Sequence, residues 1–457
     1  MQEIERSNDI DDSSGSKAWE YRQYIHWVPI PDYRLHVTIV VDAILQVNLS
    51  KGVEPLTKFS VYIPTRNRLD LLQFAVSSVI QQNYSDWELI VSDNDSEDDV
   101  AGYIQSLNDH RIKYYRTDHF VSVTENWNNA LSHTTGEYVT LLGDDDCLMP
   151  DYFSALTPLI EQFHQPDVIH TDGYLFLYPG IVMERTQNGM LLTGYNSFFN
   201  PTKSYLLERK EALTLVRNSL QLKIDFLYNL QLFCVRREFV QSLAAKGKFF
   251  QSPFPDYYVL VMLFLKATTI LIYQQPMVVV GISPKSIGYL LFNKREQEGV
   301  SQLNNLGEYQ SSRLANKMFP GNYEIANRLI AMDVFQQNYD EELRSVGIEV
   351  DYGAFRRAQI RFNYERYYLD RLLPQENFHA ARTHMTQLER FWYDMWLMPT
   401  FVLLRQFSPR IRGGLIRRFR KLIGHRVDYG YKRWSVVDFK NILEVAQQMP
   451  SRHIEQV

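Results

Sequence analysis

The sequence predicts a doubly wound α/β domain, and two observations support this fold class. From Phe59 onward, short apolar runs with the pattern of strands alternate with segments whose apolar residues recur at helical spacing. Polar clusters also follow three of the predicted strands, which is where an open α/β sheet binds its ligands. Strands that alternate with helices through short loops indicate a mainly parallel sheet with crossover helices on its faces.

The predicted elements follow one another closely along the chain. Strands are expected at residues 59–63, 88–92, 112–116, 138–142, 167–178 and 269–273. Helical segments lie between the first of these strands, with Asn67 and Thr124 as expected N-caps and Gly136 as an expected stop. The apolar run that begins at Tyr257 is predicted to be a buried helix as far as Lys266.

The composition is that of a globular protein with about two to three domains. Of its 457 residues, 45% are apolar and 22% are charged, and the net charge of −5 gives no support for nucleic acid as a partner. Two cysteines cannot form a disulfide framework, and the first residues lack the apolar core of a signal peptide. Residues 257–273 are interrupted by Lys266 and are too short to span a bilayer. We therefore expect a cytoplasmic protein.

Three regions of the chain differ in their pattern. Residues 1–56 begin with a polar stretch and are expected to form an N-terminal extension that is partly disordered. The α/β pattern occupies residues 57–291. Residues 292–457 are rich in Arg, Tyr and Gln and are predicted to be a mainly helical C-terminal region.

Three polar clusters are the candidate functional residues of the α/β domain. They are Pro64-Thr65-Arg66-Asn67, Asp93-Asn94-Asp95-Ser96 and Asp144-Asp145-Asp146. Because the carboxyl ends of parallel strands meet at one edge of a sheet, the clusters are expected to converge on one ligand. Carboxylate oxygens suit Mg²⁺ or Mn²⁺, and the other polar groups suit a nucleotide. The chain has no glycine-rich phosphate loop, so a metal would have to neutralise the phosphates.

Several ordered motifs resemble those of glycosyltransferase family 2. They are FSVYIPTRNR at 59–68, SSVIQQNY at 77–84, WELIVSDNDS at 87–96, and GEYV at 136–139 leading into the Asp triplet and Pro150-Asp151. The resemblance is clear over roughly residues 58–155 and extends to about residue 290. It implies a GT-A fold, which is a Rossmann-like, mostly parallel sheet with flanking helices. It also implies a nucleotide-diphosphate sugar as the donor, a Mn²⁺ or Mg²⁺ ion, and inversion at the anomeric carbon.

The resemblance also assigns positions to the donor and the metal. Asp93 would bind the uracil or other base, and Pro64, Thr65 and Arg66 would lie along the nucleoside. Asp145 is expected to be the chief metal ligand.

Two further carboxylates, Asp144 and Asp146, stand beside Asp145. Asp146 is expected to assist it on the metal, with Asp144 on the donor. Many family members have an Asp where this chain has Gly143, so the pair that holds the metal stays open among Asp144, Asp145 and Asp146.

An inverting transfer needs a general base, and Asp256 is the candidate. Family members keep this Asp or Glu well after the metal motif and before an apolar helix, and Pro253-Phe254-Pro255-Asp256-Tyr257-Tyr258 fits that description. The alternative reading of Asp256 is an ordinary helix N-cap, and Asp225 is a weaker competitor for the base. Lys285 and Ser286 either meet the diphosphate or belong to a surface loop, and His170 is predicted to be a core histidine.

The segment from 405 to 433 is strongly basic. It holds ten Lys or Arg residues and one acid, Asp428, and its apolar residues fall on one face of a helix. A basic amphipathic helix with aromatic residues upstream is the pattern of an interfacial membrane anchor. The alternative is a solvated helix packed on the catalytic domain. An anchor would place the protein peripherally on the inner face of the plasma membrane.

The function that the resemblance implies is metal-dependent, inverting transfer of a sugar, from a UDP-sugar, to a glycan or polyprenyl-linked acceptor. The resemblance places that reaction in surface-polysaccharide assembly. A nucleotidyltransferase is the first alternative, but it needs a glycine-rich loop after the first strand and residues 64–68 contain no glycine. The second alternative is a catalytically silent sugar-binding or membrane-scaffold protein that retains the fold.

Overall fold

A computed structural model describes most of the chain from residue 58 onward. The described residues are 58–181, 188–192, 204–223, 229–292, 317–321, 323–408 and 436–449, together with positions 303, 314, 411, 414 and 415. Three parts of the sequence predictions therefore lie outside the described residues. They are the N-terminal extension at 1–56, most of the basic segment 405–433, and Asp225, the alternative candidate for the general base. Residues from Thr57 on form one unit.

The centre of the fold is a sheet whose first four strands are parallel. They are β1 (Phe59–Thr65), β2 (Trp87–Asp93), β3 (Ile112–Arg116) and β4 (Tyr138–Leu141). Their spatial order is β4-β1-β2-β3, so β1 lies at the middle of the group. Residues of β1 and β2 are almost all buried, because both faces of these strands are covered, which explains their continuous apolar sequence. The doubly wound arrangement predicted from the sequence is confirmed.

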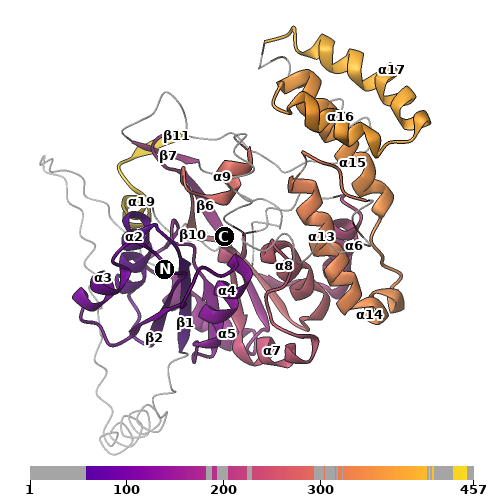
Figure 1. The fold of residues 1–457 in the computed structure, drawn as a ribbon. Coiled ribbons are helices and arrows are strands. Elements are labelled where there is room, and N and C mark those ends of the chain that lie inside the picture. The colour runs from indigo at the N-terminus through magenta and orange to yellow at the C-terminus, as the bar shows by residue number, and fades with distance from the viewer. Residues whose placement is uncertain are drawn as a thin grey trace, which may run out of the picture. The chain divides into compact units, whose positions relative to one another are not determined.

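Three crossover helices cover the two faces of these strands (Figure 1). They are α2 (Leu69–Ile80), α3 (Val100–Ser106) and α4 (Val123–Ser132). Crossovers between parallel strands are right-handed, so α2 and α3, which carry the chain in one direction along the sheet, share a face. Helix α4 carries the chain back across β1 to β4 and lies on the other face, where it contacts β1 and β2.

The helix starts differ from the predicted caps. Asn67 does not cap α2; instead, Oδ2 of Asp98 in the neighbouring loop accepts from the Leu69 N–H at 3.0 Å. Helix α4 is capped by Ser122, which forms a capping box with Glu125. Thr124 lies inside the helix and donates to the Ser252 carbonyl oxygen at 2.7 Å.

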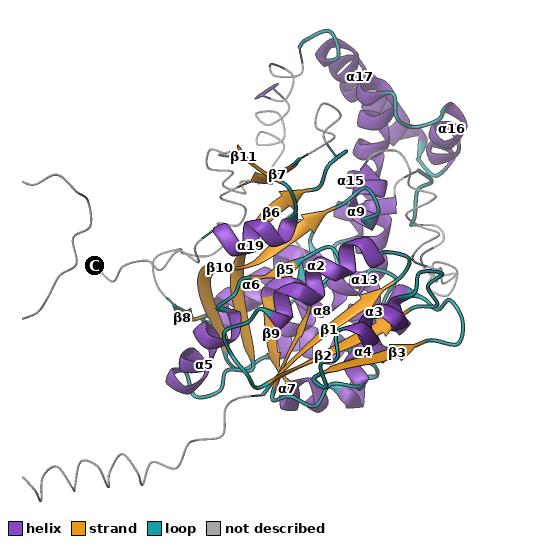
Figure 2. Cartoon of the chain, turned by 90° about the vertical axis from the view of Figure 1, so that its left-hand side faces the viewer, coloured by secondary structure: helices purple, strands orange, loops and turns teal. Residues whose placement is uncertain are grey.

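The second half of the sheet is mixed (Figure 2). Strand β9 (Phe233–Arg236) lies antiparallel between β4 and β6 (Val168–Leu177), and β10 (Ile270–Ile282) runs parallel to β6. The short strands β5 (Cys147–Leu148) and β8 (Tyr205–Leu206) pair antiparallel with β10. Helices α5 (Tyr152–Gln162), α6 (Arg209–Leu220), α7 (Arg237–Ser242) and α9 (Ile287–Phe292) and the 3₁₀ turns η1 (Leu230–Leu232) and η2 (Ala244–Lys246) complete this half.

Helix α8 (Pro255–Lys266) is the buried helix predicted before the last strand. It is apolar all round because it contacts both α6 and α13 (Tyr323–Asn338) and packs into the main core. A short connection then leads into β10. None of the described helices is long and apolar enough to cross a membrane.

The C-terminal region is mainly helical, as predicted. After α13 come α14 (Asp340–Ser345), α15 (Tyr352–Tyr364), a π-helical turn η3 (Glu365–Asp370), α16 (Gln375–Thr383) and α17 (Gln387–Leu404). Helices α15, α16 and α17 share a small core of their own. The sequence did not indicate that β11 (Val436–Phe439) then pairs with β7 (Gly189–Leu192) of the sheet and that α19 (Ile442–Gln448) contacts α2.

Candidate active site

The predicted convergence of polar clusters is present at the carboxyl edge of the parallel strands. Thr65 at the end of β1 is in register with Asp93 at the end of β2. Strand β4, paired with β1 through Tyr62 and Leu141, ends at the same edge and leads into the Asp triplet. Residues far apart in the sequence therefore meet at one edge, as an open α/β sheet requires of a ligand site.

Asp144 is held by residues of the first cluster. The Thr65 hydroxyl donates to its Oδ2 at 2.8 Å, and the Arg68 guanidinium pairs with its Oδ1 at 3.0 Å. Arg68 also donates to the Lys285 carbonyl oxygen, so it links the loop after β1 to the loop after β10. The side chain of Thr65, expected along the nucleoside, thus orients an acid of the triplet in this structure.

Asp145 and Asp146 are held by the end of β10 and the residues after it. Oδ2 of Asp145 accepts from the hydroxyls of Ser283, at 3.1 Å, and Ser286. Asp146 accepts from the backbone N–H of Gly281 at 2.7 Å and from that of Gly143 at 3.0 Å. Asp146 thereby closes the turn, whereas no hydrogen bond to Oδ1 of Asp145 is recorded among the described residues.

The carboxylate oxygens of the Asp triplet are of the kind that binds Mg²⁺ or Mn²⁺, although they do not converge into a complete set of metal ligands. Among the described residues no three His, Cys, Asp or Glu side chains are grouped to hold a metal by themselves. Magnesium needs only one or two carboxylates when phosphates supply further oxygens. Burial, followed by the charge of Asp145, raises the pKa of Asp146 well above its usual range, and burial also raises that of Asp144. A cation bound here would offset this clustered negative charge.

Gly143 is required by the conformation of Asp146. A Cβ atom at position 143 would overlap the Asp146 Oδ2 atom, which is fixed by its two N–H donors. We expect Gly143→Ala to lower the free energy of unfolding by about 1–3 kcal/mol, because the carboxylate must leave these donors. Denaturant unfolding measures this, with Gly414→Ala as control, since a Cβ there meets nothing within 4 Å. Equal losses in both variants would contradict the expectation.

Asp93 lies at the predicted position but is covered. Its side chain is fully buried, and Oδ2 accepts from the Tyr114 hydroxyl at 2.7 Å and pairs with Arg116 at 3.3 Å. Oδ1 accepts from the Ser96 N–H at 2.9 Å, which shapes the second cluster. A nucleotide base that reaches Asp93 must therefore displace the half-exposed Arg116 side chain or bind against the Asp93–Arg116 ion pair.

Arg66 shapes the loop beside Asp93. Its guanidinium donates to the carbonyl oxygens of Asn94 and Asp95 and lies 3.9 Å from the centroid of the Phe120 ring. Asp95 adopts a positive φ of 56°, which is unfavourable for most side chains and which these contacts stabilise. Arg66 is thus close to the expected nucleoside position and holds the backbone there.

Asp256 is an isolated acid at the start of α8. The N-cap is Phe254, Pro255 occupies the first turn, and the Asp256 side chain makes no capping hydrogen bond. Its Oδ1 atom is buried without a hydrogen-bond partner among the described residues. Burial alone raises the pKa of Asp256 to about 8. The ordinary N-cap reading is therefore not what the structure shows.

The position of Asp256 relative to the sheet follows from its helix. Helix α8 leads through a short connection into β10, which runs toward the carboxyl edge, so the N-terminus of α8 lies toward that edge. The negative charge of Asp256 is among the causes, after burial, that raise the pKa of Tyr62 on β1. The loop before α8 is fastened to α4, because Asn128 exchanges hydrogen bonds with the backbone of Phe250.

Several residues near this edge were not singled out from the sequence. Arg68 lies directly before α2, and Ser283 directly follows β10. Asp172 on β6 is a further acid, partly buried, and burial raises its pKa to about 7. His170 is buried, with its pKa lowered by burial to about 3, which confirms that it is a core histidine.

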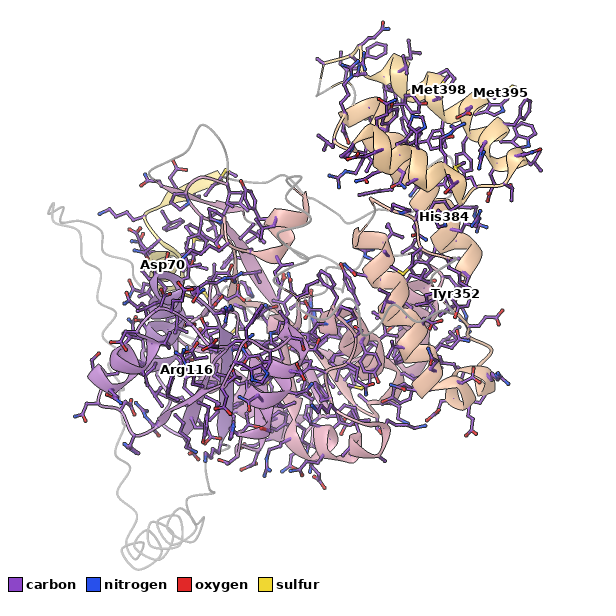
Figure 3. The ribbon with its side chains drawn as sticks, in the orientation of Figure 1. Asp70, Arg116, Tyr352, His384, Met395 and Met398 are labelled. Carbon is purple, nitrogen blue, oxygen red and sulfur yellow. The ribbon has the colours of Figure 1, made fainter. Side chains whose placement is uncertain are left out.

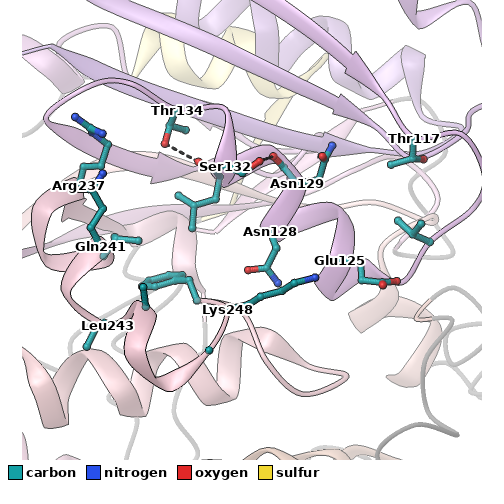
Figure 4. A pocket seen from close by; sticks show the side chains of 16 residues that line it. Thr117, Glu125, Asn128, Asn129, Ser132, Thr134, Arg237, Gln241, Leu243 and Lys248 are labelled. Atoms are coloured by element: carbon teal, nitrogen blue, oxygen red, sulfur yellow. Dashed lines mark hydrogen bonds between the residues drawn. The ribbon is translucent and has the colours of Figure 1, made fainter.

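A cavity of about 690 Å³ lies away from these acids, between α4 and the α7–η2 segment (Figure 4). Its polar walls are already engaged: Asn129 donates to Ser92, Arg237 donates to the Gly136 carbonyl oxygen, and Thr134 donates to that of Leu131. None of the predicted site residues lines it. We therefore place the candidate active site at the sheet edge.

Comparison with known proteins shows what this part of the chain is similar to. The family described as glycosyl transferase family 2 matches residues 60–209. A GalNAc(5)-diNAcBac-PP-undecaprenol beta-1,3-glucosyltransferase of Campylobacter jejuni is 35% identical over 136 residues, 29% of this chain and 41% of that protein. A UDP-Glc:alpha-D-GlcNAc-diphosphoundecaprenol beta-1,3-glucosyltransferase of Escherichia coli is 31% identical over 87 residues, 19% of this chain and 34% of that protein.

A solved structure of S. aureus TarS 1–349 in complex with UDP-GlcNAc has a TM-score of 0.42 at 13% identity, covering 74% of this chain and 92% of that one. The chain spans less than half the length of the two glucosyltransferases it matches. The family match contains β1 to β4, the three polar clusters and the carboxyl edge on which they meet. Residues 60–209 thus match the model of glycosyl transferase family 2, which is the family that the sequence motifs resemble.

Proposed function

We propose that this chain is a metal-dependent, inverting glycosyltransferase that moves a sugar from a UDP-sugar to a lipid-linked or glycan acceptor. The observation that carries the proposal is Asp256, a partly buried acid whose buried Oδ1 atom has no hydrogen-bond partner among the described residues, at a helix end that points toward the edge holding the Asp triplet. A structural acid would be expected to have a hydrogen-bond partner, since a buried polar group without one costs stability. Perturbed acids of this kind occur preferentially at functional sites.

The proposed chemistry assigns the proton transfer to Asp256. As the acceptor hydroxyl oxygen attacks C1 of the sugar, its proton passes to the Asp256 carboxylate. The bond from C1 to the diphosphate oxygen breaks, and its electron pair leaves with the nucleotide diphosphate. When bound at Asp145, with Asp146 as the assisting acid, Mn²⁺ or Mg²⁺ would supply charge stabilisation for that leaving group. Asp144 is held ready beside it by Thr65 and Arg68.

The proposal that the sugar donor carries UDP rests on the second polar cluster, residues 93–96. A carboxylate such as Asp93 can accept from N3–H of uracil, and the loop that Arg66 holds offers backbone groups to the ribose. The matched Escherichia coli protein is named as a UDP-Glc enzyme, which supports the same nucleotide here. Pro64 leads into this loop from β1.

The acceptor class rests on the relatives. Both matched glucosyltransferases are named for undecaprenol-diphosphate acceptors, which are held in membranes. A lipid-linked glycan in surface-polysaccharide assembly is therefore the proposed acceptor. The ten cations of 405–433 would suit an anionic membrane surface on the cytoplasmic side.

Calorimetric binding of UDP, GDP, dTDP and CMP, each with and without Mn²⁺, tests the proposal. We expect UDP to bind and Mn²⁺ to tighten it. Slow hydrolysis of the matching UDP-sugar, with acceptor omitted, would separate an active enzyme from a silent relative. Absence of binding to every nucleotide in the presence of Mn²⁺ would overturn the proposed function.

The pH dependence of transfer gives a further prediction. Asp256 must be ionised to act as a base, and its pKa in the free protein is raised to about 8. We expect kcat/KM for the acceptor to rise with pH up to about 8 and then level off. Initial rates from about pH 6 to about pH 9 measure this limb. A flat profile across that interval would speak against Asp256 as the base.

A further inference from the structure

The outer face of α17 is apolar and exposed. Along this helix, large apolar side chains recur at spacings of three and four, and they point away from the protein. The exposed fractions are 67% for Leu388, 54% for Phe391, 51% for Trp392, 51% for Met395, 64% for Trp396 and 57% for Leu403. Contiguous exposed patches of this kind mark interaction surfaces in otherwise ordinary proteins. We call these six residues the α17 outer face.

The orientation of α17 is fixed by its opposite side. There, Phe401 and Leu404 are buried in the small core shared with α15 and α16. Asp394 forms a bidentate pair with Arg382 of α16, with one N–O distance of 2.7 Å. Figure 3 labels Met395 on the outer face and Met398, which packs against the core. The helix therefore cannot simply rotate to bury its outer face.

The charge pattern indicates what covers this face. No charged residue occurs between Asp394 and Arg405, so the second half of α17 carries no charge on either side. The basic segment 405–433 begins immediately after it in the sequence. This segment contains ten Lys or Arg residues and only one acidic residue. Trp and Phe beside a run of Lys and Arg suit the boundary between acyl chains and anionic headgroups. A second copy of the chain would bring two basic segments together, which their mutual repulsion opposes.

We propose that the α17 outer face docks on the surface of an anionic lipid bilayer, with the helix lying in the interfacial plane. The helix has 18 residues and is about 27 Å long, which allows its aromatic side chains to enter the headgroup region along one line. The proposal deepens the proposed function, on which it rests, by naming the surface that brings the enzyme to a lipid-linked acceptor.

Vesicle binding of the full chain tests this docking. Sedimentation with phosphatidylcholine vesicles, with and without phosphatidylglycerol, measures the partition of wild type and of a Trp392→Ser/Trp396→Ser variant. We expect wild type to bind the anionic vesicles with a blue shift of tryptophan fluorescence. In the variant, partition falls about tenfold or more and the shift is reduced. A Leu206→Ser/Val437→Ser variant, which removes two other exposed apolar side chains, should bind as wild type does.

Two results would overturn the proposal that the α17 outer face docks on a bilayer. One is equal partition of wild type and the Trp392→Ser/Trp396→Ser variant. The other is light scattering that shows a wild-type dimer and a monomeric variant, with no vesicle binding by either, since that assigns the face to a second copy. Hydrolysis of UDP-sugar without lipid keeps the two proposals distinct, because a failure of docking leaves that hydrolysis intact in wild type. Circular dichroism confirms that the variants are folded.

Discussion

Asp256→Asn is expected to lower kcat for sugar transfer by about 10²–10⁴-fold while UDP affinity stays within about twofold. The amide has nearly the same shape but cannot accept the acceptor's proton, so only the step that needs a base is lost. Single-turnover transfer to a lipid-linked acceptor measures the rate, and calorimetry measures UDP binding. A variant with near-normal turnover would remove Asp256 from the role of base.

The stability of the same variant separates a catalytic acid from a structural one. The folded pKa of Asp256 is about 8, against an ordinary value of 3.8, so the folded state retains a proton that the unfolded chain releases. Wild-type stability therefore falls as pH rises from about 4 to about 8 through this group. Asn does not ionise, so the variant should be more stable than wild type at pH 8, and the difference should fade toward pH 4. A helix cap would give the opposite sign near neutral pH.

Asp145→Ala is expected to abolish the tightening of UDP by Mn²⁺, which we expect to be about 10²-fold in wild type. Of the three acids, Asp145 is the one whose Oδ1 has no recorded hydrogen bond, while its neighbours are engaged by Thr65, Arg68 and backbone N–H groups. Removing its carboxylate leaves the diphosphate without the cation that offsets its charge. Titrations of UDP with and without Mn²⁺ in both proteins measure the coupling.

A matched control for this experiment is Asp70→Asn. Asp70 also lies near the loop after β1 and loses the same charge, but it is exposed and pairs with Lys285 at 2.8 Å. Figure 3 labels it on α2. Its variant should keep the Mn²⁺ effect within about twofold, because an exposed pair contributes little. Should Asp145→Ala retain the full effect as well, the metal belongs to Asp144 or Asp146.

Strands β1 and β2 were predictable because their burial on both faces demands largely apolar runs, and the edge strand β3 was predictable from its place in the strand-helix alternation. The predicted strand at 112–116 matches β3, and 88–92 falls one residue short of β2 at each end. Helix starts were not predictable in the same way. For α2, the acceptor that the N-terminal N–H of Leu69 needs is supplied by Asp98 in another loop, which lies close only after β2 has formed. Local sequence cannot distinguish that partner from Asn67.

The positions of the acidic residues of the candidate site were predictable from the sequence, but the residues that hydrogen-bond to them were not. Strand ends in a parallel sheet place Asp93 and the triplet on one edge whatever the details of the loops. Ser283 and Ser286, which hold Asp145, both lie just after β10, and only the pairing of β10 in the sheet brings them close to the triplet. Asp256 needed the family resemblance to be noticed, and its lack of a partner could be seen only in three dimensions.

The pairing of β11 with β7 has a consequence for biosynthesis. Strand β7 acquires a neighbour on its outer side only when β11 has been made, and the whole helical region lies between them in the sequence. A nascent chain on the ribosome therefore presents β7 as an unpaired edge for most of its synthesis, and such edges attract other strands. The outer side of β7 is therefore covered only once that late segment has emerged.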